Sequence, residues 1–443
     1  PYYRNRLGGD CFMPWVRLHG TKDYLDMLLI LEQFPSLHQT FNVVPSLIDQ
    51  LEDYLPPQGR SDHFLDVSRK AARDLTEEEQ RFVLQNFFLV NWDRMVKPYP
   101  RYHDLLAKRG EAIEPVQWPQ LLKRFKPQDY LDLQVWFNLV WIDPWFRQDD
   151  PELAALERKA SRFTEQEKQR VLQKQLELIA RIVPAYREAQ RRGQIELSCS
   201  PYYHPIMPLL CDSRSARMAL AQLPLPEVSF RHPEDATWHL HQGLKRHETV
   251  FGTPAKGIWP SEGSVSEELA GLAIAEGLRW MATDEEILWR TIKQPRSPHA
   301  LYRPHAVRRA QGCVNMVFRD RELSDLIGFT YSQWNAPAAV QDFLARMARI
   351  AEQTKTLPSP ALVSIILDGE NAWEAYPHDG HDFLSRLYEA LAADSRLKLV
   401  TISEFLDLAP PDATHSLPEV FAGSWIDANF ATWIGHPEKN TAW

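Results

Sequence analysis

Apolar residues in this chain come in short runs that are separated by longer stretches with helical spacing. The runs have the length of buried strands, and the stretches between them repeat apolar residues every three or four positions, which predicts helices. The expected strands are residues 38–44, 194–199, 256–259, 278–282, 313–318, 361–367 and 398–402. The expected helices are residues 21–34, 46–54, 233–251, 264–276, 336–354 and 380–392, after a loop over residues 1–20. Strands that alternate with helices predict an α/β fold with a parallel sheet.

Two stretches have the S/T-x-x-E spacing that marks the first turn of a helix. They run from Thr76 to Glu79 and from Ser264 to Glu267. The hydroxyl and the carboxylate of such a pair can each accept a hydrogen bond from a backbone N–H that the helix leaves free. We therefore expect helices to begin at both places.

Residues 61–189 differ from the rest of the chain because they are rich in charge and mostly helical in pattern. We interpret them as a helical insertion between two strands of a barrel; a separate helical domain is the alternative. The barrel is expected to cover residues 1–410. Residues 411–443 are rich in aromatic residues, and we expect them to begin a helical C-terminal segment that continues beyond this chain.

Carboxylates stand at or near the ends of several expected strands. They are Glu196, Glu262, Asp284, Asp320 and Asp368. In a parallel α/β barrel the functional groups gather at the carboxyl ends of the strands, whereas an open sheet would spread them out. Two carboxylates and flat aromatic surfaces are what cleavage of a glycosidic bond requires, and Trp259 and Trp373 each stand close to one of these carboxylates.

Composition narrows the function further. The net charge of -9 and the pI near 6.0 give no basic surface for nucleic acid. No apolar run reaches the roughly 20 residues that a membrane-spanning helix needs. The four cysteines form no C-x-x-C pair, which is typical of reduced thiols and predicts a cytoplasmic protein. The 15 tryptophans fit sugar stacking and core packing equally well. The chain opens on Pro1 rather than Met, so targeting stays open.

Five stretches, in order along the whole chain, carry a resemblance to glycoside hydrolase family 57, and most to its amylopullulanase-type members. Each is weak alone, and the five together are specific. They are Pro1-Tyr2-Tyr3, Gly193-Gln194-Ile195-Glu196, Trp259-Pro260-Ser261-Glu262, Asp368-Gly369-Glu370-Asn371-Ala372-Trp373 and Thr432-Trp433-Ile434-Gly435. The first resembles the end of a His-Gln-Pro motif, and the His-Gln itself is missing here.

The resemblance implies an incomplete (β/α)7 barrel and retaining cleavage of an α-glucan or maltooligosaccharide. It implies Glu262 as nucleophile and Asp368 as general acid/base, with Glu196 bonding sugar hydroxyls. The missing histidine normally lines the site, so its absence predicts weaker substrate binding. We expect Glu262 to stay ionised, and burial and a neighbouring negative charge to raise the pKa of Asp368 so that it can donate a proton.

Other residues are weaker candidates for substrate binding. Trp259, Trp373 and Trp433 are interpreted as stacking platforms, with core packing as the alternative. Glu370 lies two positions after Asp368 and could tune its pKa or bind substrate. His19 could face the site from the first loop or cap a helix. Glu196 has a strand-end ion pair as its alternative role. His204, between Tyr203 and Pro205, is interpreted as a packed residue.

No metal ion or cofactor is expected. The stretch Pro377-His378-Asp379-Gly380-His381-Asp382 concentrates imidazoles and carboxylates, but we interpret it as a helix start capped by Asp379. Motifs do not decide between hydrolysis and transfer, so a 4-α-glucanotransferase or a branching enzyme is also compatible with the same site. Two further hypotheses stay open, a metal-dependent polysaccharide deacetylase and a non-catalytic glycan-binding protein. The oligomeric state is left open.

Overall fold

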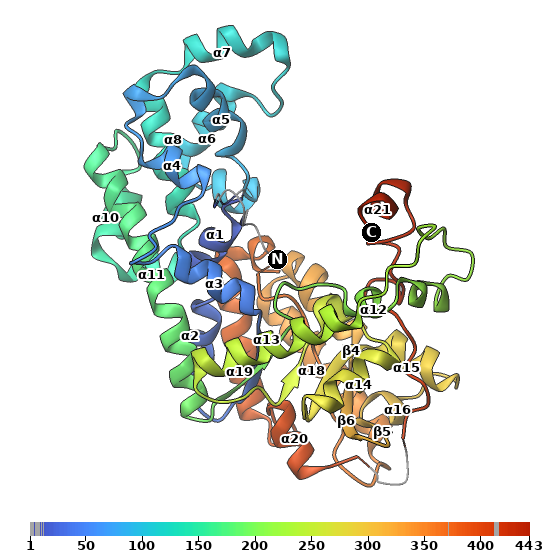
Figure 1. Cartoon of the computed structure of the whole chain (residues 1–443). Coiled ribbons are helices and arrows are strands. Elements are labelled where there is room, and N and C mark those ends of the chain that lie inside the picture. The colour runs from blue at the N-terminus through green and yellow to red at the C-terminus, as the bar shows by residue number, and fades with distance from the viewer. Residues whose placement is uncertain (1–3, 5–8, 10, 12, 371, 412–415) are drawn as a thin grey trace.

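The computed structural model describes residues 4, 9, 11, 13–370, 372–411 and 416–443, and its centre is a six-stranded sheet (Figure 1). The strand order is β1-β2-β3-β4-β6-β5. The neighbouring pairs are parallel except β5 and β6, which form an antiparallel hairpin that the sequence did not predict. The strands are β1 Gln39–Val43, β2 Ile195–Cys199, β3 Gly257–Ile258, β4 Trp280–Asp284, β5 His305–Arg309 and β6 Gly312–Arg319.

The expected strands 361–367 and 398–402 are extended segments that lie beside the sheet without forming regular strands. The first bonds to β6, where the Asp320 amide donates to the Ser364 carbonyl at 2.8 Å. At Ile366 the backbone bonds to side chains instead of to a neighbouring strand. Its carbonyl accepts from Arg319 Nε, and its amide donates to Ser324 Oγ. The second segment flanks β1 through the Leu399 carbonyl. The result is an incompletely closed α/β barrel, as expected.

The expected helices 233–251, 264–276, 336–354 and 380–392 are present with small shifts at their ends, and the shorter helices between residues 285 and 325 and at 402–408 were not predicted. Together these helices cover the outside of the sheet (Figure 1). They are α13 Pro233–Phe251, α14 Glu267–Ala275, α15 Glu285–Ile292, α16 Pro298–Leu301, α17 Arg321–Asp325, α18 Ala336–Thr354, α19 His381–Ala393 and α20 Ile402–Leu408. Two shorter helices lie earlier in the chain, α3 Pro45–Asp53 and α12 Met207–Cys211.

The beginning of the chain differs from the expected loop and single helix. Two helices, α1 Trp15–Lys22 and α2 Asp26–Glu32, occupy this region. The helix is interrupted between them, where the Tyr24 carbonyl accepts from the Tyr186 hydroxyl at 2.7 Å. Because a tertiary contact made far along the chain takes this carbonyl, local periodicity could not reveal the break.

One expected helix start is confirmed and the other is wrong. Thr76 and Glu79 form a reciprocal capping box at the start of α5. Helix α14 is capped by Ser266, whose hydroxyl accepts from the Leu269 amide, and not by Ser264. The Glu267 carboxylate instead pairs with Arg309, a residue of β5.

The charged segment forms a helical lobe on one side of the barrel (Figure 1). Its helices are α4 His63–Arg69, α5 Glu77–Asn86, α6 Pro100–Arg109, α7 Trp118–Arg124, α8 Pro127–Val140, α9 Pro144–Asp149, α10 Pro151–Lys159 and α11 Glu165–Arg191. Fully buried Arg17 of α1 donates to Asp62 at 2.9 Å and to Asn138 at 3.0 Å, and so joins the lobe to the barrel. The exact division into an insertion at 61–189 and a barrel over 1–410 stays a prediction.

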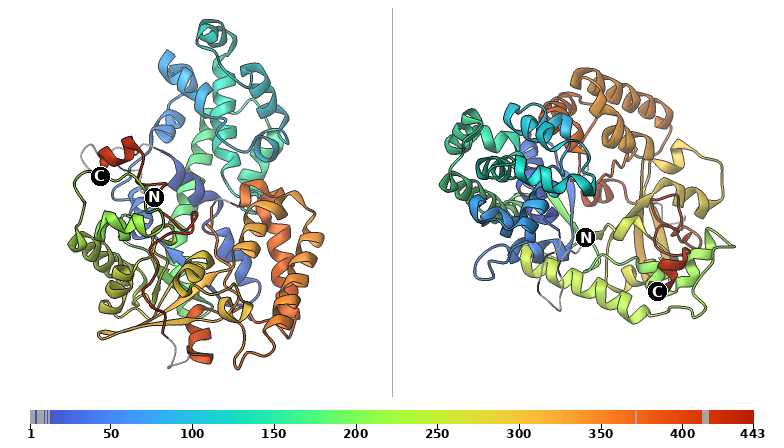
Figure 2. Two further views of the ribbon diagram at one scale, coloured as in Figure 1. Left: turned by 90° about the vertical axis from the view of Figure 1, so that its right-hand side faces the viewer. Right: turned by 90° about the horizontal axis from the view of Figure 1, so that it is seen from above.

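The C-terminal tail, residues 416–443, is mostly turns with one short helix, α21 Pro437–Ala442. It stands apart from the helical lobe (Figure 2). Phe430 and Ile434 pack against Ile206 and Leu209 in a small apolar cluster of their own. Among the described helices, none combines the length and the apolar character needed to cross a membrane.

Candidate active site

Glu262 lies in a tight turn directly after β3. The strand ends at Ile258, and after Trp259 and Pro260 the residues Ser261–Gly263 form a single 3-10 turn. Within it Glu262 has φ 55° and ψ 31°, in the left-handed region that a residue with a side chain seldom adopts. Such a conformation costs of order 1–3 kcal/mol and is concentrated at functional sites. The turn leaves the Glu262 side chain half-buried at the carboxyl end of the sheet.

Trp425, from the C-terminal tail, holds Glu262 in this conformation. Its indole N–H donates to Glu262 Oε2 at 3.0 Å, and its backbone amide donates to the Glu262 carbonyl at 3.2 Å. The Trp425 ring meets Trp259 edge to face at 5.1 Å, and the Arg319 guanidinium lies 5.5 Å from its centre. Sequence reasoning missed Trp425, because its only local signal is an aromatic residue in an irregular tail.

The charge of Asp368 reaches Glu262. Burial raises the pKa of Glu262, the Trp425 hydrogen bond lowers it, and the negative charge of Asp368 raises it again, with a net rise. The two carboxylates, which follow different strands or strand-like segments, are therefore close enough for their charges to interact. The separation that retention requires, about 5–5.5 Å, stays a prediction.

Glu370 and His19 extend this charged group. Burial and the charge of Asp368 raise the pKa of Glu370, and the charge of His19 lowers it. Burial lowers the pKa of His19, but its hydrogen bond with Asp23 and the charge of Asp23 produce a net rise. His19 Nδ1 lies 2.6 Å from Asp23 Oδ2, within α1 rather than in a loop. The charge of His19 thus acts on Glu370, and Glu370 interacts with Asp368.

Glu196 lies elsewhere. It is the second residue of β2, near the amino end of the sheet, whereas the expected strand placed it near a carboxyl end. Its side chain accepts from Trp280 Nε1 at 2.9 Å, from the Ser403 hydroxyl at 2.6 Å and from the Ser403 amide at 2.8 Å. With both oxygens bonded to protein donors and the residue 8% exposed, Glu196 is a buried link between β2, β4 and α20.

The three candidate stacking residues have different surroundings. Trp259 is half-buried and contacts Trp425 beside Glu262. Trp373 is 4% exposed and packs against Gly380, where a Cβ atom would come within 2.7 Å of its ring. Trp433 packs on the apolar cluster of the tail, and its carbonyl accepts from Trp443. Trp259 therefore lies beside the Glu262 turn, whereas Trp373 has no broad exposed face.

A second buried charge network joins α1 to the turn that precedes α19. Lys22 of α1 bonds both Asp23 and Asp379. The prediction that Asp379 caps the helix is wrong. The N-cap position of α19 is Gly380, and no side chain caps that helix. The carboxylate of Asp379 turns to the buried lysine instead, since an unpaired ammonium in the core would be costly.

Three residues of this region could hold a metal ion. Ligand atoms of Asp26, Asp143 and His381 lie within 4.8 Å of one another. His381 Nε2 is 2.9 Å from Asp143 and 3.6 Å from Asp26. Burial lowers the pKa of His381, but the two carboxylates raise it to about 10. A protonated imidazole between two carboxylates accounts for the same geometry, so the expectation of no metal stays a prediction.

His204 and the first motif complete the set of residues singled out in the sequence. His204 has φ 58° and lies in the turn after β2, where burial lowers its pKa to about 4, as suits a packed neutral imidazole. The stretch Pro1-Tyr2-Tyr3, which carries the first motif of the resemblance, lies outside the described residues.

Comparison with known proteins gives the same family as the motifs. The model of glycosyl hydrolase family 57 matches residues 1–418. The fold is similar to a GH57-type branching enzyme from Pyrococcus horikoshii, with TM-score 0.58 and 18% identity over 100% of this chain and 74% of that one. A GH57 branching enzyme from Thermococcus kodakaraensis gives TM-score 0.58 and 15% identity over 100% and 75%.

A third structure, the α-amylase AmyC from Thermotoga maritima, gives TM-score 0.53 and 16% identity over 96% of this chain and 75% of that one. A search among curated proteins found no match. At these identities the structural likenesses show the fold, and the family model covers nearly the whole sequence. The chain belongs to glycosyl hydrolase family 57.

Proposed function

We propose that this protein is a retaining enzyme acting on α-glucans, a hydrolase or a transglycosylase. The observation that carries the proposal is the strained, tightly held carboxylate of Glu262, on which the charge of Asp368 acts. Glu262 attacks the anomeric carbon while Asp368 protonates the departing glycosidic oxygen. Asp368 then removes a proton from water or from a sugar hydroxyl, which displaces Glu262 from the glycosyl-enzyme.

The environment of Glu262 supports the role of nucleophile. The Trp425 indole bonds only one carboxylate oxygen, Oε2, which leaves Oε1 for attack on the sugar. A fixed donor of this kind holds the carboxylate in one orientation, so little reorganisation is needed when it reacts. The edge of Trp259 lies beside the same turn and supplies apolar surface for the ring of the reacting sugar.

An α-glucan is proposed as the substrate because the chain belongs to family 57 and folds like proteins described as branching enzymes and an α-amylase. The amylopullulanase-type activity suggested by the sequence is a narrower form of the same proposal, which pullulan tests directly. The cytoplasmic location also stays a prediction. All four cysteines are free, which is compatible with a reducing compartment.

Product analysis tests the proposal. The wild type and the variants Glu262→Gln and Asp368→Asn are incubated with maltooligosaccharides, pullulan and amylose. Only shorter sugars mean hydrolysis, a ladder of longer and shorter sugars means transfer, and new α-1,6 linkages mean branching. We expect both variants to lose at least about a hundredfold in rate. Retention is read from the anomeric form of the first product.

Two results would contradict the proposal. An active wild type that releases acetate and loses activity with a chelator would be a deacetylase. Glucan binding without turnover in the wild type, unchanged in Glu262→Gln, would indicate a glycan-binding protein that no longer cleaves.

A further inference from the structure

Arg319, the last residue of β6, joins the segments that carry both candidate catalytic carboxylates. It is buried, with 6% of the residue exposed. Its Nε donates at 2.7 Å to the carbonyl of Ile366, two residues before Asp368. Its guanidinium carbon lies 5.5 Å from the ring centroid of Trp425, which in turn donates to Glu262. None of the five sequence motifs includes this arginine.

The segment that leads to Asp368 is attached to β6 at two carbonyls. The first is that of Ser364, which accepts from the Asp320 amide at 2.8 Å. The strand β6 ends at Arg319, so the second carbonyl, that of Ile366, takes its hydrogen from the arginine side chain instead of from a strand backbone. This bond therefore helps to fix the position at which Asp368 leaves the sheet.

On the other side, Arg319 supports the indole that orients Glu262. Trp425 belongs to the C-terminal tail, which is mostly turns, so contacts with the barrel have to hold its ring in place. A guanidinium within about 6 Å of an indole centroid is attracted to the face of the ring, most strongly where water is excluded. Trp259 adds an edge-to-face contact at 5.1 Å. Arg319 thus helps to fix the N–H that bonds Glu262 Oε2.

Two carboxylates hold Arg319 itself. Asp284, the last residue of β4, is its register partner on the neighbouring strand, and its buried side chain accepts from Nη1 at 3.4 Å. Asp325 of α17 accepts from Nη2. Arginine carries five donors on one rigid plane, so one side chain can bond a carbonyl and two carboxylates while it also contacts a ring. Arg319 is therefore a fixed support rather than a mobile side chain.

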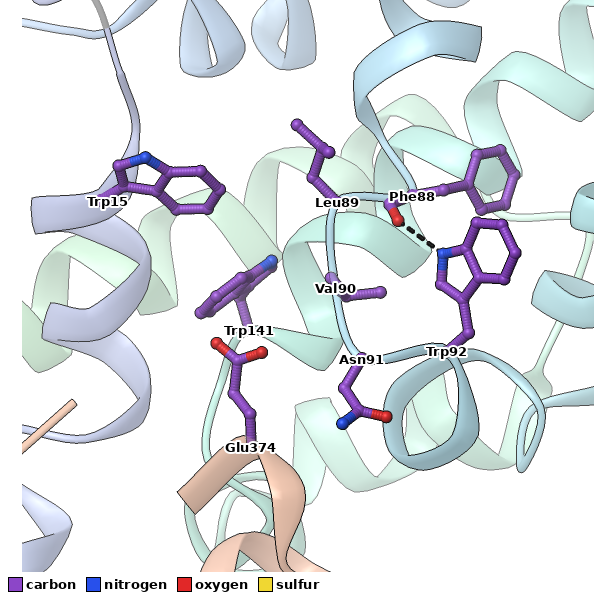
Figure 3. Close-up of a pocket in the computed structure, with 8 residues that line it drawn as sticks. All are labelled: Trp15, Phe88, Leu89, Val90, Asn91, Trp92, Trp141 and Glu374. Atoms are coloured by element: carbon purple, nitrogen blue, oxygen red, sulfur yellow. Dashed lines mark hydrogen bonds between the residues drawn. The ribbon is translucent and has the colours of Figure 1, made fainter. Parts of the chain in front are cut away.

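Arg319 lies outside the open groove beside the site. The loop that follows Asp368 continues to Glu374, whose side chain faces Trp141 in a groove of about 540 Å³ (Figure 3). Arg319 does not line this groove, and its small exposed fraction offers little surface to a sugar. Its loss is therefore expected to change the rate of the reaction more than the affinity for the substrate.

We propose that Arg319 is a positioning residue for both candidate catalytic carboxylates. It holds Asp368 through the carbonyl of Ile366. It holds Glu262 through the indole of Trp425. The inference rests on the proposed function, because it assumes that these two carboxylates perform the reaction. A misplacement of about 1 Å in such a group can cost about a hundredfold in rate.

Two substitutions separate the two contacts, because their atoms match different parts of the arginine. In Arg319→Lys a methylene replaces Nε and the ammonium replaces the guanidinium carbon, so the cation near Trp425 is kept and the donor to Ile366 is lost. In Arg319→Gln the amide nitrogen replaces Nε, so the donor is kept and the cation is lost. The matched control is Arg321→Gln. Arg321 also donates to Asp284, but in the described structure it bonds neither Ile366 nor Trp425.

Steady-state kinetics across pH use maltoheptaose and an aryl glycoside with a good leaving group. We expect Arg319→Lys to lower kcat on maltoheptaose about tenfold or more with KM nearly unchanged, because Asp368 is displaced. The aryl glycoside needs little protonation and is affected less.

Arg319→Gln is expected to move the acidic limb of the kcat/KM profile to higher pH. The Trp425 hydrogen bond lowers the pKa of Glu262, and a less firmly held indole lowers it less. In a Trp425→Phe background this shift disappears, since the group that transmits it is gone. Arg321→Gln is expected to keep the limb and the kcat of the wild type.

Thermal unfolding shows which variants are folded, and Arg319→Lys, which leaves a cation beside both carboxylates, decides the question if Arg319→Gln is not. If the folded variants keep the kcat and the limb of the wild type, or slow both substrates equally without moving the limb, the positioning role is wrong and the proposed function stands. A limb that shifts equally with and without Trp425 overturns the route through the indole. A wild type that turns over neither substrate overturns both the function and the inference.

Discussion

Trp425 and Glu262, 163 positions apart in the chain, are joined by two hydrogen bonds, one to the carboxylate and one to the backbone. The first fixes where the carboxylate points. The second supports a residue whose φ of 55° is unfavourable without help. The tail therefore completes a site whose other residues belong to the barrel, and this pair is the first place to test.

Trp425→Phe removes the indole donor and keeps an aromatic ring beside Trp259. A hydrogen bond to a charged group contributes about 1.5–3 kcal/mol, so kcat/KM is expected to fall about 10- to 100-fold. The bond also lowers the pKa of Glu262, so its loss moves the acidic limb of the kcat/KM profile to higher pH. Steady-state kinetics across pH measure both effects. Trp118→Phe, in the lobe, is the matched control.

Asp368→Asn is expected to move that limb in the opposite direction. The charge of Asp368 raises the pKa of Glu262, and the amide carries no charge. Glu262 then ionises at lower pH, so the remaining activity persists further into the acid range. An aryl glycoside with a good leaving group is the substrate to use, because it needs little protonation. An unshifted limb would mean that the two carboxylates do not sense each other.

Gly257→Ala and Gly271→Ala form a contrasting pair for stability. A Cβ atom at Gly257 in β3 would lie 1.9 Å from the Trp280 ring, which is 1% exposed and cannot withdraw. We expect a loss of about 1–3 kcal/mol or more in the free energy of unfolding. Nothing lies within 4 Å of the same atom at Gly271, inside α14, where alanine should stabilise by about 0.5–1 kcal/mol. Urea unfolding midpoints compare them.

Glu196→Gln separates a structural role from a sugar-binding one. In the wild type the Trp280 indole, the Ser403 amide and the Ser403 hydroxyl donate to the two carboxylate oxygens of Glu196. The glutamine side chain has only one oxygen, so at least one of these donors loses its acceptor. The expected result is a free energy of unfolding lower by about 1–3 kcal/mol, with KM for maltoheptaose close to that of the wild type. A stable variant with a greatly raised KM would instead place Glu196 in contact with substrate.

Periodicity predicted the parallel strands and the longer outer helices, because each of them buries a face whose apolar residues recur at regular spacing in the sequence. It did not predict the β5–β6 hairpin, whose two-residue turn, Ala310-Gln311, has only the following Gly312 as a local signal. The break after Lys22 depends on a bond from Tyr186 in α11 and is invisible locally. Segment 361–367 has the apolar character of a strand, but side chains satisfy part of its backbone.

In the candidate site too, residues with a local sequence pattern could be predicted, and residues that depend on distant contacts could not. Glu262 and Asp368 could be named as candidates in advance, because a strand end followed by a turn is a local pattern and both lie in motifs that resemble family 57; their catalytic roles stay a prediction. Trp425 could not, because its contact with Glu262 depends on where the tail comes to lie. Glu196 was predicted to lie near the carboxyl end of a strand. The structure places it near the amino end, because β2 begins at Ile195, only one residue before it.

The bond between Trp425 and Glu262 also sets an order of events during synthesis. All barrel strands leave the ribosome before Trp425 does, so an emerging chain carries its carboxylate without the partner that orients it. Catalytic competence would therefore appear only when the turns around Trp425 dock, and not gradually as the barrel folds. A protease that nicks the chain between Asp407 and Trp425 would separate folding from activity in the same way.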